Sequence, residues 1–138
     1  MPEAKQSGYE ELEHTADWAL KVWAPDLEAL FGQAAIGMND LAEMELSESE
    51  RIEKAFTLEA LDAEGLLVEF LSELLYYSEM ERLGFDHFEL EIGAQQLTAK
   101  VAGSPIAALK KEIKAVTFYD LEIEQSAAGL EVVIVFDV

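Results

Sequence analysis

Two long segments carry hydrophobic residues at the three- and four-residue spacing of an amphipathic helix. The first begins at Asp26, a candidate N-cap, and runs to about Asp40. The second spans about residues 63–81, follows Asp62 as its candidate N-cap and ends at residues 82–84, which include a glycine. An apolar stripe of this kind usually packs into a core, so we expect each helix to bury one face.

Gly32 and Gly37 fall inside the first of these helices. Each lowers the stability of a helix by about 1 kcal/mol relative to alanine. We therefore expect another segment to pack closely against the helix at both positions.

Shorter segments alternate hydrophobic and polar residues, which is the period-two pattern of a half-buried strand. The strands predicted in this way lie at residues 18–23, 52–60, 88–92, 97–101, 113–119, 121–124 and 132–138. Between them, residues 44–50 predict a surface loop, residues 103–105 predict a break, and residues 106–111 predict a loop or a single helical turn. Together these elements indicate an α+β fold, a two-layer sandwich in which two main helices pack on a largely antiparallel or mixed sheet.

The chain is most simply one domain, because 138 residues suffice to bury roughly two thirds of the surface of the unfolded chain. We expect residues 1–8 to be a disordered leader and residues 9–138 to form the domain. No stretch approaches the roughly 18 uncharged apolar residues of a membrane span, and the first residues do not resemble an export signal. Cysteine is absent, which excludes disulfides and thiolate metal sites and favours a cytoplasmic location.

The net charge of −20 comes from 29 acidic and 9 basic residues. A surface this acidic repels phosphate backbones and anionic lipid, so we expect neither direct binding of nucleic acid nor binding to a membrane. Four of the basic residues reverse the sign locally, namely Lys100, Lys110, Lys111 and Lys114. That stretch either binds an anion or reduces the electrostatic repulsion among the acidic residues.

Acidic residues near the two ends of the chain are the first candidates for a functional site. Asp17 follows His14 and Thr15, where a polar loop passes into the first predicted strand. Asp137 and the carboxylate of Val138 come at the end of a strongly strand-forming run. If these three carboxylates converge, their repulsion requires a cation or a base nearby. The alternative is that Asp17 and Thr15 only satisfy local backbone donors.

Several short motifs, taken in their order along the chain, resemble the archease family. They are Glu11-Leu12-Glu13-His14-Thr15-Ala16-Asp17, Asp26-Leu27-Glu28-Ala29-Leu30-Phe31, Asp62 with Leu66-Leu67 and Glu73-Leu74-Leu75, Glu112-Ile113-Lys114-Ala115-Val116-Thr117-Phe118, and Phe136-Asp137-Val138. The resemblance covers essentially the whole chain after the leader. Phe118-Tyr119 differs from the Tyr-His common after the lysine motif, so this chain lacks the hydroxyl and the imidazole at those two positions.

The resemblance implies both a partner and a function. Archeases are accessory proteins of the RtcB-type RNA ligase, which joins RNA ends with GTP and a metal in tRNA splicing and RNA repair. This chain would then be a non-enzymatic activator that promotes guanylylation and multiple turnover of the ligase. The functional residues of the family carry over onto Lys114, Asp17 and Asp137, with Asp17, Asp137 and the Val138 carboxylate as metal ligands and His14 and Thr15 beside them.

The expected ligands also narrow the choice of metal. Carboxylate oxygens without imidazole or thiolate favour calcium, magnesium or manganese over softer ions, and we expect calcium or magnesium here. Lys114 would offer a point positive charge to a phosphate or to acids of the partner. The alternative for Lys114 is a strand lysine that extends into solvent and has no role.

The sequence leaves two other functions open. One is a metal-dependent hydrolase in which Asp17 and Asp137 hold a nucleophilic water, and the other is a chaperone-like acidic module. The sequence has no glycine-rich phosphate loop and no serine in a nucleophile elbow. His14 is the only credible general base, because His87 is expected in a loop or at a strand edge. This shortage of bases argues against the hydrolase.

Overall fold

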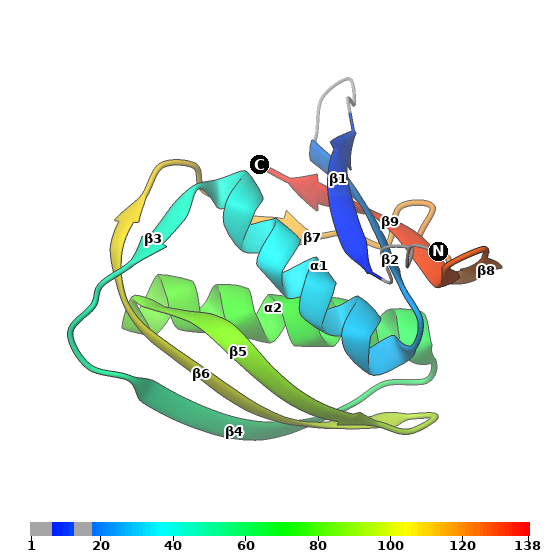
Figure 1. The fold of residues 1–138 in the computed structure, drawn as a ribbon, viewed down its shortest axis with the longest axis horizontal. Helices are drawn as coiled ribbons and strands as arrows, with labels where there is room; N and C mark the ends of the chain where they lie inside the picture. The colour runs from blue at the N-terminus through cyan, green and yellow to red at the C-terminus, as the bar shows by residue number, and fades with distance from the viewer. Residues whose placement is uncertain (1–6, 13–17) are drawn as a thin grey trace, which may run out of the picture.

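Two antiparallel sheets and two helices form the structure, a computed structural model that describes residues 7–12 and 18–138 (Figure 1). The helices are α1 Leu27–Ala42 and α2 Ala63–Glu81. The strands are β1 Gly8–Leu12, β2 Trp18–Ala24, β3 Met44–Leu46, β4 Ile52–Glu59, β5 Leu83–Ile92, β6 Gln96–Leu109, β7 Ala115–Val116, β8 Glu124–Ser126 and β9 Gly129–Asp137. In this described part of the chain, no helix is long and apolar enough to span a membrane. The predicted α+β class, with two helices packed on antiparallel strands, is confirmed.

The strands divide into two sheets. The first sheet has the order β1-β2-β9-β7, and β8 is a further partner of β9. In the second sheet, the long strand β6 pairs with β3, β4 and β5. Helix α1 contacts β2 of the first sheet and β5 of the second, while α2 contacts β4 and β5 of the second sheet and β7 of the first. The two helices therefore join the sheets around one core (Figure 1).

Both helices begin at the aspartates that the sequence identified as N-caps. The Asp26 side chain accepts a hydrogen bond from the backbone N–H of Ala29 at 2.9 Å, and the Asp62 side chain accepts one from Gly65 at 2.8 Å. Helix α2 has the predicted bounds, and α1 continues slightly beyond its predicted end. Arg82 caps the C-terminus of α2 in the left-handed conformation, and β5 begins at the next residue.

The core centres on Phe70 of α2. The centre of its ring lies 5.9 Å from that of Phe31 in α1, 6.4 Å from that of Phe56 in β4 and 6.0 Å from that of Phe88 in β5. Phe31 and Phe70 are fully buried. Aromatic contacts of this kind contribute about 0.5–1.5 kcal/mol each beyond the burial of apolar area, so the cluster fastens both helices to the second sheet.

The second sheet extends further than the sequence predicted. Residues 44–46, predicted as part of a loop, form β3 and pair with the end of β6. The predicted break at residues 103–105 is wrong, because β6 runs through it to Leu109. The predicted loop or helical turn at residues 106–111 is wrong for the same reason as far as Leu109.

Close approach of two strands explains the glycine at the predicted break. A Cβ atom on Gly103 would lie only 1.8 Å from the carbonyl oxygen of Gly84, which precedes Phe85, the residue of β5 that pairs with Gly103. Glycine is therefore needed here for strand pairing, although a glycine and a proline so close in the sequence usually signal the end of a strand.

The strands before the C-terminus are shorter than predicted. Of residues 113–119, only Ala115–Val116 form a strand, and residues 121–123 form none. Leu121 and Ile123 pack against the core without a sheet partner, which produces the alternating pattern that predicted a strand. An alternating hydrophobic pattern shows which side chains are buried, but it does not show whether the backbone pairs with another strand.

The N-terminal strand β1 was not predicted. Gly8, expected as the last residue of the leader, is the first residue of β1, which pairs with β2. Residues 1–6 of the expected leader lie outside the described residues.

The two glycines of α1 differ in their surroundings. A Cβ atom on Gly37 would lie 2.6 Å from a methyl carbon of Leu20 and 3.0 Å from the ring of Tyr9, so the close packing predicted there is confirmed. A Cβ atom on Gly32 would have no neighbour within 4 Å, and the prediction is wrong at that position.

The Tyr9 hydroxyl donates a hydrogen bond to the Asp40 carboxylate and so ties β1 to α1. This bond, with some burial and the charge of Asp40, raises the pKa of Tyr9 to about 12. The fold favours the neutral phenol, so the stabilisation is complete below the unfolded-state pKa of about 10 and is lost as the pH rises through the folded-state value.

We expect Tyr9→Phe to remove this part of the pH dependence. The free energy of unfolding of the wild type should fall between about pH 10 and about pH 12, and that of Tyr9→Phe should fall less steeply. Urea unfolding at a series of pH values measures both proteins. Identical slopes above about pH 10 would contradict the role of this hydrogen bond.

Candidate functional site

The end of β9 and the short strand β7 lie side by side in the first sheet (Figure 1). Ala115 pairs with Asp137, and Val116 pairs with Phe136. Just before β7, the backbone N–H of Lys114 donates to the carbonyl oxygen of Asp137 at 2.8 Å. Backbone pairing thus brings together two residues that the sequence predicted as parts of one site.

The side chains at this sheet end differ in exposure. Those of Lys114 and Asp137 are exposed, whereas Val138 is half-buried and packs against the hydrophobic core. Within the described residues, the Lys114 ammonium forms no ion pair, even with the neighbouring Asp137. In a chain with a net charge of −20, this ammonium is available to an anion from outside.

The other predicted site residues, His14, Thr15 and Asp17, lie outside the described residues, and their part in the site stays a prediction. Trp18, which follows Asp17 in the sequence, begins β2 and pairs with Phe136, the residue before Asp137. Among residues 7–12 and 18–138, no three His, Asp or Glu side chains are grouped as metal ligands. Because the predicted set includes Asp17, this observation does not test it.

Lys111 holds the segment before β7 in place. Its backbone N–H donates to the carbonyl oxygen of Ala42, at the end of α1, at 3.0 Å. Its ammonium lies 3.1 Å from a carboxylate oxygen of Glu43 and 5.1 Å from the centre of the Trp18 ring. The sequence did not predict this role, because the residues that Lys111 contacts are far from it along the chain.

Beyond β7 the chain exposes two aromatic side chains. The Thr117 hydroxyl donates to the carbonyl oxygen of Val135 at 2.9 Å and fixes this segment to β9. Phe118 and Tyr119 follow, and they are 62% and 60% exposed. Aromatic residues are enriched where proteins contact one another, so this exposed segment, a few residues after Lys114 in the chain, suits a protein partner.

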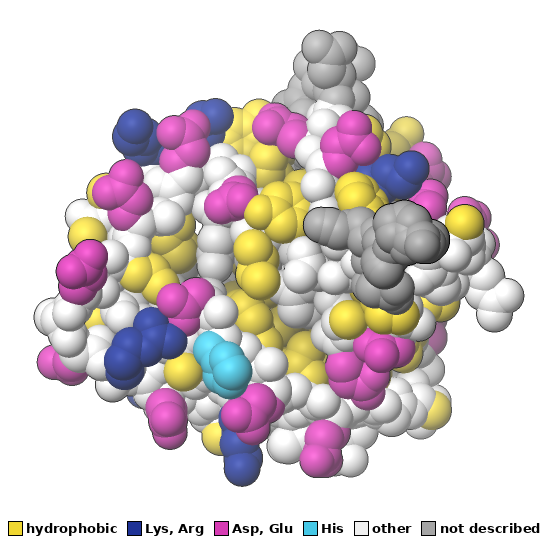
Figure 2. Space-filling model, in the orientation of Figure 1, with side chains coloured by type: hydrophobic (Ala, Val, Ile, Leu, Met, Phe, Trp, Pro, Cys, Tyr) yellow, Lys and Arg dark blue, Asp and Glu magenta, His cyan; other side chains and the backbone are white. Residues whose placement is uncertain are grey.

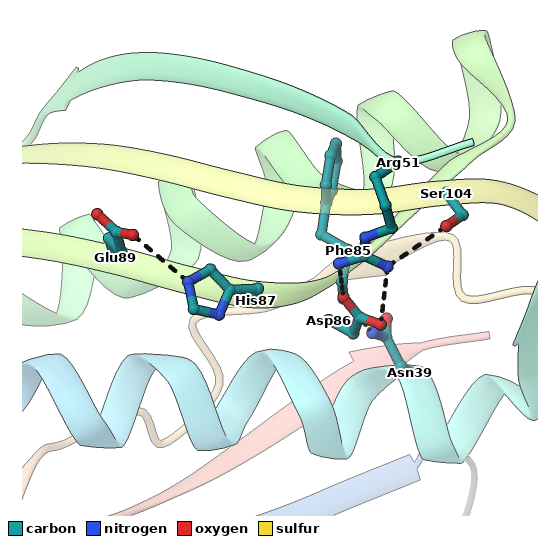
Figure 3. A network of polar contacts seen from close by, with 7 residues as sticks. All are labelled: Asn39, Arg51, Phe85, Asp86, His87, Glu89 and Ser104. Carbon is teal, nitrogen blue, oxygen red and sulfur yellow. Dashed lines mark hydrogen bonds and ion pairs between the residues drawn. The ribbon is translucent and has the colours of Figure 1, made fainter. Parts of the chain in front are cut away.

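A separate polar network lies on the second sheet (Figure 3). Arg51 donates two hydrogen bonds to the Asp86 carboxylate, at 2.6 and 3.2 Å, and these bonds lower the pKa of Asp86. His87, predicted in a loop or at a strand edge, lies in the edge strand β5, where its ring nitrogen is 3.4 Å from Glu89. None of these residues belongs to the predicted site, and Arg51 links the segment before β4 to Asp86 of β5 and Ser104 of β6 instead.

Both the sequence and the fold of this chain resemble those of known proteins. The model of the Archease protein family (MTH1598/TM1083) matches residues 9–138. The chain belongs to the archease family. Among curated archeases, that of Methanosarcina mazei is 34% identical over 139 residues, which cover 94% of this chain and 95% of the relative. The resemblance inferred from the short motifs is therefore confirmed.

Two solved structures show the same archease fold. The solution structure of Methanobacterium thermoautotrophicum protein 1598 aligns with a TM-score of 0.70 and 24% identity, and covers 95% of this chain and 99% of its own. The crystal structure of an archease, a possible chaperone, from Thermotoga maritima aligns with a TM-score of 0.69 and 24% identity, and covers 94% and 96%. Two helices on antiparallel sheets are thus the archease architecture.

Proposed function

We propose that this archease is a non-enzymatic activator of an RtcB-type RNA ligase, the partner that the family resemblance implies. It would promote guanylylation of the ligase and its turnover over many cycles, in tRNA splicing and RNA repair in the cytoplasm. The observation that carries the proposal is Lys114, whose ammonium is exposed and has no ion-pair partner among the described residues, and whose backbone N–H donates to the carbonyl oxygen of Asp137 at 2.8 Å.

The surroundings of Lys114 support action through a protein partner. Phe118 offers an exposed apolar contact close to Lys114 in the chain. The net charge of −20 disfavours direct contact with RNA phosphates. A single positive charge in so acidic a protein can instead meet a phosphate of the ligase's nucleotide or an acidic residue of the ligase.

A divalent cation, calcium or magnesium, is part of this proposal. Asp17, Asp137 and the Val138 carboxylate would hold it through oxygen atoms, which are the ligands that both ions prefer. The pairing of Trp18 with Phe136 supports this ligand set, since Asp17 and Asp137 each adjoin one member of that pair in the chain. When bound, the ion would neutralise the repulsion among the three carboxylates.

Calcium or magnesium is expected to stabilise the folded protein if the proposed site exists. At a free concentration about 100 times the dissociation constant, mass action adds about 2.7 kcal/mol to the free energy of unfolding. Thermal unfolding with the ion and with a chelator measures the difference. A melting temperature indifferent to both would contradict the site.

Adding one glycine after Val138 tests a single ligand of this site. The addition converts the α-carboxylate into an amide and should weaken cation binding, since one ligand charge is removed. Unchanged affinity in the extended protein would remove Val138 from the ligand set.

Ligase guanylylation, followed over many turnovers at fixed GTP, tests the function itself. We expect this protein to increase guanylylation of the ligase and to turn over no nucleotide or RNA when the ligase is left out. Hydrolysis of nucleotide or RNA by the protein alone would support the metal-dependent hydrolase instead. Protection of unrelated unfolded proteins, without any effect on the ligase, would support the chaperone-like module, the role that the Thermotoga maritima protein's description as a possible chaperone suggests.

A further inference from the structure

An open cleft of about 550 Å³ lies between the C-terminal ends of the two helices and the second sheet. Its walls come from residues 38–44, from the C-terminal part of α2 after residue 71 with its C-cap Arg82, from residues 83–85 and from residues 109–115. Figure 2 shows the surface hollowed between α1 and β3, with hydrophobic side chains visible there. Cavities of about 300–1,000 Å³ are the usual size of small-molecule sites.

Much of the lining is apolar. Hydrophobic side chains reach the cleft from both helices, from the second sheet and from the segment before β7: Met38, Met44, Leu75, Leu83, Phe85 and Ile113. Such a lining gains free energy by excluding water, so the cleft favours an apolar body.

Five donor groups on residues that line the cleft have no hydrogen-bond or ion-pair partner within the described residues. They are the hydroxyls of Ser72, Tyr76 and Ser78, the guanidinium of Arg82 and the ammonium of Lys114. Ser78 is only 8% exposed, yet no fully buried side-chain oxygen or nitrogen of the described residues lacks a hydrogen bond. The Ser78 hydroxyl must therefore be open to the cleft. An anion can accept a hydrogen bond from each of these five groups. The carboxylates of Glu79 and Glu112, which also make no ion pair within the described residues, cannot donate one.

The charges around the cleft also favour an anion. The lining contains four cations, of which Lys110 and Lys111 are paired with Glu43 at 3.8 and 3.1 Å. Among the described residues, the lining contains two acids, Glu79 and Glu112, and Glu43 adds a third negative charge beside Lys110 and Lys111, so four cations face three acids. In a chain with a net charge of −20, this excess of cations reverses the overall sign. A negative ligand is therefore repelled less here than by the rest of the surface.

We propose that the cleft binds a small organic anion, with an apolar body that fills the cleft and a carboxylate or phosphate group that draws on the unpaired donors Arg82 and Lys114. Lys114 belongs both to the cleft and to the sheet end beside Asp137. A bound anion would therefore compete for the ammonium that ligase activation uses. This last consequence, unlike the binding itself, rests on the proposed function.

Octanoate is a suitable probe, because it combines a carboxylate with a short apolar chain. Titration of the full chain, followed by NMR through the backbone amide signals, should shift the signals of residues 38–44, 72–85 and 109–115 in a saturable way. The same titration with 1-octanol, which lacks the charge, and with inorganic phosphate, which lacks the apolar body, should give weaker binding. Equal affinity for octanol would overturn the anionic part of the proposal, and equal affinity for phosphate would overturn the apolar part.

Two substitutions identify the donors. Arg82→Gln and Lys114→Gln are each expected to weaken octanoate binding about tenfold, the loss of one charge-assisted hydrogen bond. Lys100→Gln is the matched control, because Lys100 is an exposed lysine of β6 that does not line the cleft. Weakening by either cleft variant, with circular dichroism showing a folded protein, supports the proposal. Octanoate affinity unchanged in both variants, or no saturable shift in the wild type, would overturn it.

A separate assay tests whether anion binding in the cleft affects activation of the ligase. Octanoate at saturating concentration is expected to lower the stimulation of the ligase by the wild type, and a ligase reaction without this protein is the control for direct inhibition. If the protein gives no stimulation at all, the proposed function fails, while the NMR titration still decides whether the cleft binds the anion.

Discussion

Replacing Lys114 with alanine is expected to lower the stimulation of the ligase about tenfold or more, with the fold unchanged. The side chain is exposed and makes no ion pair within the described residues, so its removal costs the folded protein little. A charge-assisted hydrogen bond to a partner is worth about 1.5–3 kcal/mol, and its loss corresponds to a tenfold or larger effect. Guanylylation over many turnovers measures the stimulation.

Variants of the acidic residues distinguish the role of the Lys114 ammonium from the role of the bound cation. An ammonium cannot ligate a cation, so Lys114→Ala should bind calcium or magnesium as the wild type does. Asp17→Ala and Asp137→Ala should lose both cation binding and stimulation while remaining folded, because relief of repulsion among the carboxylates offsets part of the lost binding.

Lys100→Ala is the matched control for Lys114→Ala, since it removes an exposed lysine from β6, in the other sheet. We expect it to stimulate the ligase as the wild type does. Full stimulation by folded Lys114→Ala and Asp17→Ala proteins would refute the proposed site.

Gly103→Ala is expected to destabilise the protein by about 3 kcal/mol or more, the range of severe steric changes in a core. The added methyl carbon would lie 1.8 Å from the Gly84 carbonyl oxygen and 2.7 Å from its carbonyl carbon. Both are backbone atoms, which cannot rotate away as a side chain can, so β5 and β6 would have to separate. Urea unfolding followed by circular dichroism measures the change in the free energy of unfolding.

Two other glycines provide controls for the same substitution. Gly32 lies in α1, and an added methyl carbon there would have no neighbour within 4 Å, so Gly32→Ala should stabilise the helix by about 0.5–1 kcal/mol. Gly93, between β5 and β6, has its nearest neighbour at 3.7 Å, and Gly93→Ala should be close to neutral. A Gly103→Ala protein as stable as these two would show that the strands are not so closely packed.

The sequence alone determined the two helices and the family. The hydrophobic stripes predicted α1 and α2, and Asp26 and Asp62 marked where they begin. These signals are readable because a helix is stabilised by residues a few positions apart and by its own cap. The motifs around Lys114 and Asp137 identified the family, and the pairing at β7 and β9 then brought both residues together.

Only the tertiary structure decided how the strands pair. Strand β6 keeps its length because β3, β4 and β5 all pair with it, and nothing local to Gly103 or Pro105 shows those partners. Lys111 acquires its role from Glu43 and Trp18, and the cleft exists because both helices end beside the same sheet. Strand pairing and cavity walls depend on residues far apart in the sequence, so their physical cause lies in the packing of the whole chain.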